Sequence, residues 1–271
     1  MTIESDLIEY FETLGLEVHT TTKARGHLGF FLNKRIDISK NLPQNKIVST
    51  LLHEFSHFIH SKIEENIAKT GGKINVIFQT DENLEEELIK VTNFIDEHSK
   101  CELLKSHKEK VKIEIKKLDE QIKAEYPKFQ RSKQFKEFNN AIKGTHLKYL
   151  LKYDRVRILP TFLWDKEKII SVNSVAQDFP NLKPAFVNYI RLKSLTRKQR
   201  RISNRISKVK RYYRRPTELF ARFVEAFYTD EEKVKLIAPK AYKKFTDLLN
   251  NGYYLELSQA LKIAKGCLFI V

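Results

Sequence analysis

The sequence predicts an α+β fold that is mainly α, with a small cluster of strands, two packed helices that carry the functional residues, and a long helical insertion. Two observations lead to this prediction. Apolar residues recur at helical spacing along most of the chain, and glycine is scarce after the first quarter. Between Gly72 and Gly252 the only glycine is Gly144, so this stretch favours long helices.

The first 62 residues predict a helix, short strands and a second helix. Residues 1–14 have the apolar spacing of a short amphipathic helix. Short strands are expected at residues 16–21, 27–31 and 35–38, where Gly26 and Gly29 break the pattern. A second helix should follow Asn41–Pro43, which offer a capping side chain and a proline for the first turn. Its expected apolar face consists of Ile47, Val48, Leu51, Leu52, Phe55, Phe58 and Ile59.

The rest of the chain predicts further helices and a second approach to the core. Residues 85–123 carry little turn chemistry and predict one or two long helices. Residues 146–180 mix aromatic and apolar positions and should return the chain to the core. The segment from Glu231 should form helices that cover this core. We therefore expect residues 1–62 and 181–271 to form the core domain and residues 63–180 to form the helical insertion.

In the second predicted helix, the sequence HEFSH (residues 53–57) has the spacing of a catalytic zinc motif. Four residues make about one helical turn, so His53 and His57 project from one face and can bind the same ion. Zn²⁺ accepts neutral imidazole nitrogen, and two histidines leave room for a third protein ligand and a water. Glu54 is placed to take a proton from that water as general base. The alternative is a helix whose histidines only form hydrogen bonds.

His60 lies on the same stripe of this helix as His53 and His57. It could orient a ligand or serve as an alternative ligand. A surface histidine explains it at least as well, so we do not assign it to the metal.

A third ligand is predicted far downstream, on a helix that Pro216 opens. Glu218, Arg222 and Glu225 repeat on one face of this helix, and polar groups on a core-lining helix must be exposed, paired or coordinated. We assign Glu218 as the ligand and Arg222 and Glu225 as groups that orient the site. The alternative is an amphipathic helix with internal Glu–Arg–Glu ion pairs. The apolar face of the helix consists of Leu219, Phe220, Phe223, Val224 and Phe227.

Two segments resemble known zinc proteins. Residues 212–228 (YYRRPTELFARFVEAFY) look like the E-x-F-A-R-x-x-E-A-Y signature of zincin-like domains, which occur in large polyvalent proteins of phages and mobile elements. Residues 29–57 are similar to the first part of ImmA/IrrE-like metallopeptidases, in which a short strand pair precedes the H-E-x-x-H helix.

The resemblance covers residues 15–62 and 205–245, about a third of the chain. The chain departs from the family in the large insertion that separates the two histidines from Glu218. The resemblance implies a zincin-like core and peptidase chemistry, and it does not identify a substrate.

Composition predicts a folded protein of a reducing compartment. A hydrophobic content of 41% is typical of a chain with a core. Cys101 and Cys267 are the only two cysteines, which argues against a disulfide framework and against a cysteine metal site. The N-terminus is acidic where a signal peptide would be basic and then apolar, and no apolar run approaches the length of a membrane span. We expect a cytoplasmic protein without a membrane partner, and the sequence indicates no oligomeric state.

The net charge of +16 is concentrated in one segment. Residues 191–215 hold twelve basic residues and no acidic one, interleaved with Ile202, Ile206 and Val209. This spacing predicts a helix with a wide cationic surface that could neutralise phosphates of DNA or RNA. The alternatives are a solvated face, a face docked on the acidic residues 81–87, and an acidic protein partner. The candidates for nucleic-acid contact are Arg197, Lys198, Arg200, Arg201, Arg205 and Lys208.

These features predict a zinc-dependent metallopeptidase that binds one Zn²⁺ per chain and hydrolyses a peptide bond in a specific intracellular protein, with nucleic acid as a means of localising it. Tyr212, Tyr213 and Arg222 are candidates for the donor that stabilises the oxyanion. The alternative is a non-catalytic zincin-fold protein that binds nucleic acid through the basic helix. The intact Glu54 favours the enzyme, since a structural metal site needs no general base. A toxin or effector is compatible with the charge but has no specific support.

Overall fold

The computed structural model describes residues 2–21, 28–64, 67, 71–95, 100–129, 133–159 and 167–266. The chain forms two compact units, which are described separately: unit 1 comprises Met1–Ser99 and Lys210–Val271, and unit 2 comprises Lys100–Val209. The fold is α+β and mainly α, as the sequence predicts. Gly26 and Cys267 lie outside the described residues, and Cys101 is a buried free thiol.

Unit 1 contains a sheet of three short strands, close to the positions expected from the sequence. β1 (Glu17–Thr21) pairs in parallel with β3 (Arg35–Ser39), and β2 (Gly29–Leu32) pairs with β3 in the antiparallel direction. The strand order is β1-β3-β2, so β2 is an edge strand of this sheet. Asn33 and Lys34 form the two-residue turn between β2 and β3, and both have positive φ angles, 49° and 66°. This is the backbone that two-residue hairpins prefer.

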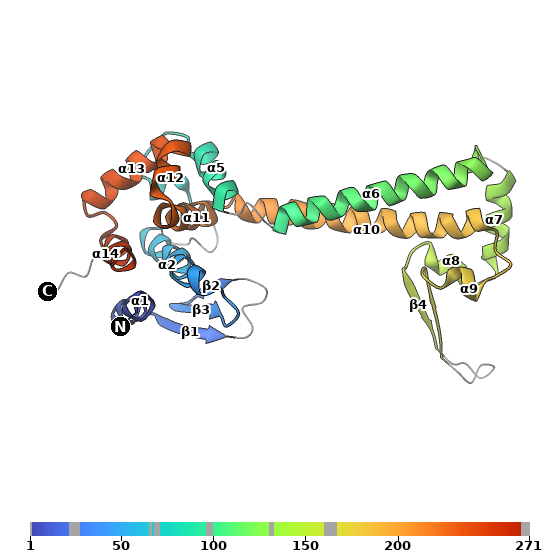
Figure 1. The fold of residues 1–271 in the computed structure, drawn as a ribbon, viewed down its shortest axis with the longest axis horizontal. Helices are drawn as coiled ribbons and strands as arrows, with labels where there is room; N and C mark the ends of the chain where they lie inside the picture. Colours follow the sequence, from blue (N-terminus) through green and yellow to red (C-terminus); the bar gives the residue numbers. More distant parts are fainter. Residues whose placement is uncertain are drawn as a thin grey trace. The chain divides into compact units, whose positions relative to one another are not determined.

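Helix α2 (Ile47–Ile63) occupies the centre of unit 1, between the sheet and α11 (Pro216–Thr229) (Figure 1). The apolar residues at helical spacing explain this position, because both faces of α2 are covered: Leu51, Leu52 and Phe55 are fully buried. One expectation about its start is wrong. Pro43 opens a short 3-10 turn, η1 (Gln44–Lys46), and α2 begins after Lys46 without a side-chain cap.

The remaining helices of unit 1 enclose these two central ones. α11 also packs against α5, and α14 packs against both α1 and α2. α1 is closed at its N-terminus by a capping box between Thr2 and Ser5. The bounds are α1 (Ile3–Thr13), α4 (Ile74–Ile77), α5 (Glu85–Ile95), α12 (Glu231–Ile237), α13 (Pro239–Asn250) and α14 (Leu255–Ala264).

Unit 2 has its own core, which is rich in aromatic rings. Phe129, Phe138, Phe186 and Tyr189 form this cluster with ring centroids 5.1 to 6.1 Å apart. Within the described ranges, no helix is both long enough and apolar enough to span a membrane. The elements are α6 (Lys100–Glu125), α7 (Lys133–Lys143), α8 (Leu147–Leu150), β4 (Arg155–Ile158), β5 (Lys168–Ser171), α9 (Val175–Asp178) and the first part of α10 (Pro184–Tyr213).

The bounds of the two units differ from the expected division at residues 62 and 181. Residues 63–99 belong to unit 1, because Leu88 and Val91 of α5 are buried in the same core as α11. Residues 181–209 belong to unit 2, because Phe186 and Ile190 at the start of α10 are buried in the aromatic core. A helix joins the core that covers its apolar face, and hydrophobic spacing alone does not reveal which core that is.

Candidate metal centre

Helix α2 presents three ionisable side chains inside unit 1. His53 and His57 lie next to Glu218 of α11, whereas Glu54 lies against Gly29 of β2. His53 and Glu54 are buried, and His57 keeps a partly exposed edge. Buried ionisable groups are unfavourable unless they are paired or bind a metal, so their partners decide what this region can do.

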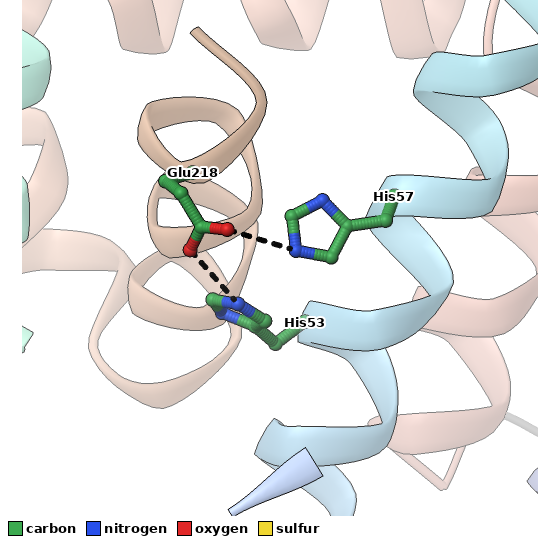
Figure 2. A group of neighbouring side chains, drawn as sticks. All are labelled: His53, His57 and Glu218. Atoms are coloured by element: carbon green, nitrogen blue, oxygen red, sulfur yellow. Dashed lines mark ion pairs between the residues drawn. The ribbon is translucent and has the colours of Figure 1, made fainter. Parts of the chain in front are cut away.

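Glu218, in the first turn of α11, reaches both histidines. One carboxylate oxygen, Oε2, lies 3.7 Å from His53 Nε2, and the other, Oε1, lies 3.6 Å from His57 Nε2. Figure 2 shows the carboxylate of Glu218 pointing from α11 at two imidazoles that come from successive turns of α2. The structure therefore brings together three residues that the sequence analysis selected from positions far apart in the chain.

The spacing of these atoms suits a shared cation. Ligand atoms of the three residues all lie within 4.8 Å of one another. Separations of 3.6 and 3.7 Å are too long for N–H···O hydrogen bonds, whereas two ligands at about 2.0 to 2.1 Å from one tetrahedral ion lie about 3.3 Å apart. Oε2 of Glu218 is also buried and accepts no hydrogen bond from the described residues. A cation between the three side chains would satisfy that oxygen.

Arg222 and Glu225, one and two turns beyond Glu218 on α11, support the first histidine. Glu225 Oε2 lies 3.0 Å from His53 Nδ1, which leaves Nε2 directed at Glu218. Arg222 Nη1 lies 3.5 Å from the same oxygen of Glu225. A carboxylate behind a histidine fixes which ring nitrogen carries the proton and how the ring is oriented. The role expected for both residues is consistent with this chain of contacts.

The two tyrosines that precede α11 have different positions. The hydroxyl of Tyr212 hydrogen-bonds to the carboxylate of Glu218, and Tyr212 lines the cleft described below. The ring of Tyr213 instead lies 5.3 Å from the guanidinium of Arg222. Tyr212 therefore reaches the centre directly, whereas Tyr213 contacts a residue that acts through Glu225.

The pKa values of the three candidate ligands are shifted by burial and by one another. Burial would lower the pKa of His53, but the carboxylates of Glu218 and Glu225 outweigh it and raise this pKa to about 10. Burial lowers the pKa of His57 to about 4. Burial would raise the pKa of Glu218, but His53 and His57 outweigh it and lower this pKa to about 2. At neutral pH His57 and Glu218 are in ligand form, and His53 must release a proton to bind a cation.

Glu54 is held against the edge strand of the sheet. A Cβ atom placed on Gly29 of β2 would lie only 2.7 Å from Glu54 Oε1 and 2.8 Å from Thr50 Cγ2. Only glycine lets the strand approach Glu54 this closely. Burial raises the pKa of Glu54 to about 7. The sequence analysis treated Gly29 only as a strand breaker, although a glycine within a strand pattern is itself a signal of close backbone approach.

His60 is not the surface histidine that the sequence analysis favoured. Its side chain is 0% exposed, and its Nε2 lies 3.4 Å from Glu64 Oε2. The ring fills a space that Gly72 leaves open, since a Cβ there would lie 2.5 Å from His60 Cε1. His60 does not join the cluster of His53, His57 and Glu218. The spacing along α2 correctly placed His60 on the same side of the helix as His53 and His57. The spacing could not show that the ring is buried, because Gly72, which lies against it, comes after the end of α2.

A cleft of about 1090 Å³ opens beside the metal centre, entirely within unit 1. Glu54, His57 and Glu218 lie on its wall. The edge strand β2 and the Asn33–Lys34 turn form one side, and the segment from Arg211 to Thr217 forms another. Two of the candidate ligands, His57 and Glu218, and the neighbouring Glu54 are therefore accessible to a molecule that enters this cleft.

The basic residues proposed for nucleic-acid contact fall into two groups on α10. Arg197 donates to Asp154 Oδ1 at 2.6 Å and to the carbonyl of Leu150 at 3.2 Å, so it holds unit 2 together and is half-buried. Arg201 donates to Asp154 Oδ2 at 2.7 Å. Lys198 is half-buried, and the residues that are exposed and have no carboxylate partner among the described residues are Arg200, Arg205 and Lys208.

Two of the acidic residues 81–87, a segment that the sequence analysis considered as a docking site for the basic segment, have partners within unit 1. Glu82 Oε2 lies 3.8 Å from Lys240 Nζ. Glu87 accepts a hydrogen bond of 2.9 Å from the backbone of Ala241. Both contacts lie within unit 1 and attach the start of α5 to α13.

Comparison of the chain with protein-family models, with curated proteins and with solved structures found no match.

Proposed function

We propose that this chain is a zinc-dependent peptidase whose metal ligands are His53, His57 and Glu218. The observation that carries the proposal is the meeting of these three side chains beside Glu54, at the wall of a cleft. Two imidazoles and one carboxylate are a donor set typical of catalytic zinc, and three protein ligands leave a position for water. Bound Zn²⁺ would lower the pKa of that water and polarise the carbonyl to be cleaved.

Glu54 is the proposed general base. It follows His53 in the chain and lines the cleft, and burial raises its pKa to about 7. A carboxylate whose pKa lies near the working pH can both accept and return a proton. Glu54 would take a proton from the attacking water and pass it to the leaving amine as the C–N bond breaks.

Tyr212 is the proposed donor to the developing oxyanion. Its hydroxyl is already directed to the centre, since it hydrogen-bonds to Glu218. Burial and the neighbouring carboxylate raise the pKa of Tyr212, which keeps the hydroxyl protonated at neutral pH. A neutral donor aimed at the position where negative charge develops lowers the barrier.

The edge strand β2 supports a polypeptide as the substrate. β2 pairs with β3 on one side only in the described sheet, and residues 29–32 line the cleft. The outer edge of such a strand presents N–H and C=O groups that can pair with an extended chain. The same strand contacts Glu54 through Gly29, so a peptide bound along it would lie close to the proposed base.

The first test is metal content by elemental analysis of protein purified without added zinc. We expect about one zinc per chain in the wild type and a sharp reduction in Glu218→Ala. The matched control is Glu232→Ala, an exposed glutamate on α12 in the same unit, which should keep its metal. Absence of zinc from the wild type, with no uptake on zinc addition, would contradict the proposal.

The second test separates the metal from the chemistry. Zinc-loaded wild type is incubated with a peptide library made from digested cell proteins, and new termini are identified by mass spectrometry. Glu54→Gln should keep its zinc but lose cleavage by a factor of about 10² to 10⁴. Cleavage that persists in a zinc-loaded Glu54→Gln variant would show that Glu54 is not the base.

A second candidate function is nucleic-acid binding by α10. The observation in its favour is the exposed group of Arg200, Arg205 and Lys208, which has no carboxylate partner among the described residues. Arg205→Glu with Lys208→Glu should weaken binding of a DNA duplex and flatten its salt dependence, because each phosphate contact contributes a slope of about −0.9 in log K against log salt. Lys110→Glu, an exposed position on α6, is the control. An unchanged slope would exclude this surface.

A further inference from the structure

The wall of the cleft beside the metal centre carries five cationic side chains. They are contributed by the β2–β3 turn, by α2 and by the segment that joins α10 to α11: Lys34, Lys62, Arg211, Arg214 and Arg215. Among the described residues, the only carboxylates on the same wall are Glu54 and Glu218, both of which belong to the proposed centre. The cleft is therefore strongly positive outside the few residues that perform the chemistry.

Of these five cations, only Lys62 has a carboxylate partner within the described part of the chain. Lys62 pairs with Glu256, and the guanidinium of Arg215 lies 5.7 Å from the ring centroid of Tyr212. Lys34, Arg211 and Arg214 have no ion-pair partner among the described residues, and all three are exposed. Unpaired cations close together repel one another, and a bound anion relieves this repulsion.

Lys34 occupies a position that favours glycine. Its φ angle of 66° lies in the left-handed region, where side chains with a Cβ are strained. Two-residue hairpin turns usually place glycine at this second position. A residue retained in an unfavourable backbone conformation beside a functional site is a sign that its side chain is used there.

We propose that the cleft selects acidic polypeptide segments, with Asp or Glu side chains near the cleaved bond contacting Lys34, Arg211 and Arg214. This inference rests on the proposed peptidase function and names its substrate class. Carboxylates are the side chains that fork-shaped guanidinium groups bind best, often through two parallel hydrogen bonds. The opposite charge would also attract an acidic segment into the cleft before it is bound.

A polypeptide fits this cleft better than a nucleic acid does. Phe30 and Leu32 of β2 line it and are 40% and 55% exposed, so they offer apolar contacts to side chains of a bound chain. The edge of β2 supplies backbone groups at the spacing of an extended peptide. The cations then distinguish acidic peptides from neutral ones that would fit the same strand equally well.

Binding is measured on zinc-loaded Glu54→Gln protein, which separates recognition from cleavage. The probes are fluorescent peptides of equal length, rich in Glu, in Gln or in Lys, and the readout is anisotropy. We expect the Glu-rich peptide to bind at least about tenfold more tightly than the Gln-rich one, as expected for one or two charge pairs near a surface. Arg211→Glu with Arg214→Glu should abolish the preference, and Lys243→Glu on α13 should leave it unchanged.

Lys34→Gly separates recognition from folding. The glycine relieves the strained φ angle, so the melting temperature should rise. The same variant should bind the Glu-rich peptide several-fold more weakly, because a cation has been removed from the cleft. A variant that merely misfolds cannot show higher thermal stability together with weaker binding. Unchanged binding of the Glu-rich peptide by Lys34→Gly would overturn the role of Lys34.

The peptide library distinguishes failure of this inference from failure of the proposed function. Enrichment of Asp and Glu around the cut positions, lost in Arg211→Glu with Arg214→Glu, is the expected result. Zinc-dependent cleavage without such enrichment would overturn the acidic preference and leave the peptidase intact. Absence of zinc-dependent cleavage would overturn both. Tighter Arg211- and Arg214-dependent binding of single-stranded DNA than of the Glu-rich peptide would assign the cleft to phosphates instead.

Discussion

The two units of the molecule treat their charged residues in opposite ways. Among the described residues, every buried histidine and every buried carboxylate lies in unit 1: His53, Glu54, His60, Glu218 and Glu225. The core of unit 2 is built from aromatic and aliphatic side chains, and its charges remain at the surface or pair across it.

The difference indicates which unit carries chemistry. Burying an ionisable group costs free energy unless it is paired, hydrogen-bonded or bound to a metal. Unit 1 concentrates this cost at one place, where α2 and α11 meet, and the same place opens into the cleft. Unit 2 contains most of the basic helix α10, but its ion pairs cost less free energy to form, since Arg197 and Arg201 share Asp154 at a partly exposed site.

Truncating a core side chain should lower the stability of the protein more than any other change proposed here. It should also show whether zinc binding depends on unit 1 alone. Phe138→Ala in unit 2 and Phe220→Ala in unit 1 each remove a ring that is at most 1% exposed, and each should cost about 3 to 5 kcal/mol of unfolding free energy. Because Phe220 lies two residues from Glu218, only Phe220→Ala should also weaken zinc binding. Denaturant unfolding and zinc titration measure the two effects. Equal loss of zinc affinity in both variants would show that the units are not separate in this respect.

Removing the charge behind His53 should weaken the metal centre without unfolding unit 1. In Glu225→Gln, the ring of His53 loses its carboxylate partner, and the zinc affinity should fall about 10- to 100-fold. Competition with a chromophoric chelator measures this change. Glu232→Gln is the matched control on the surface of α12. A Glu225→Gln variant with wild-type zinc affinity would mean that the contact is not used to hold the ring.

Two glycines, one from each unit, test the close approach of β2 to the base. Gly29→Ala introduces a Cβ that meets Glu54 and Thr50, and it should destabilise unit 1 by about 1 to 2 kcal/mol and lower turnover. Gly144→Ala meets nothing within 4 Å and should change stability by less than about 0.5 kcal/mol. Both are measured by urea denaturation. Similar small changes in unfolding free energy at the two positions would show that β2 does not hold Glu54 in place.

The smallest effect is expected at the ion pairs of unit 2. Burial would raise the pKa of Asp154, but hydrogen bonds from Ser194, Arg201 and Arg197 outweigh it and lower this pKa from 3.8 to about 2. A lowered pKa in the folded state means that the stabilisation is present above about pH 4 and is lost as the pH falls toward 2.

Asp154→Asn should therefore cost about 0.5 to 1 kcal/mol at pH 7, since the pairs are partly exposed. The difference from the wild type should shrink steadily between pH 4 and pH 2 in urea titrations. A stability difference that does not depend on pH would show that packing around Asp154, and not its charge, stabilises this part of unit 2.

Much of the fold could be predicted from local patterns. The helix over residues 3–13, the three strands and the two helices between residues 85 and 125 lie where the spacing of apolar residues places them. The start of α2 could not be placed in this way, because Asn41 offers a cap that the chain does not use. The division into units also differs from the expected one, since the apolar spacing of α5 and of the start of α10 does not reveal which core covers them.

The candidate site shows the same limit at the level of single residues. The spacing of His53 and His57 is local, so the sequence by itself determined that the two imidazoles share one face of a helix and that Glu54 stands next to the first of them. The same holds for Glu218, Arg222 and Glu225 on α11. Whether the two faces meet is a property of helix packing, and the tertiary structure alone decided that Glu218 reaches both imidazoles.

Only the tertiary structure could reveal what Gly29, His60 and Lys34 lie against. Gly29 lets a strand approach Glu54, Gly72 leaves room for the ring of the buried His60, and Lys34 lines the cleft from a turn with positive φ angles. Each of these properties depends on a neighbour distant along the chain or on the backbone path itself. The spacing of residues in the sequence shows which side chains share a face of a helix or strand. Whether that face is buried, and by which residues, depends on the elements that pack against it in the folded chain.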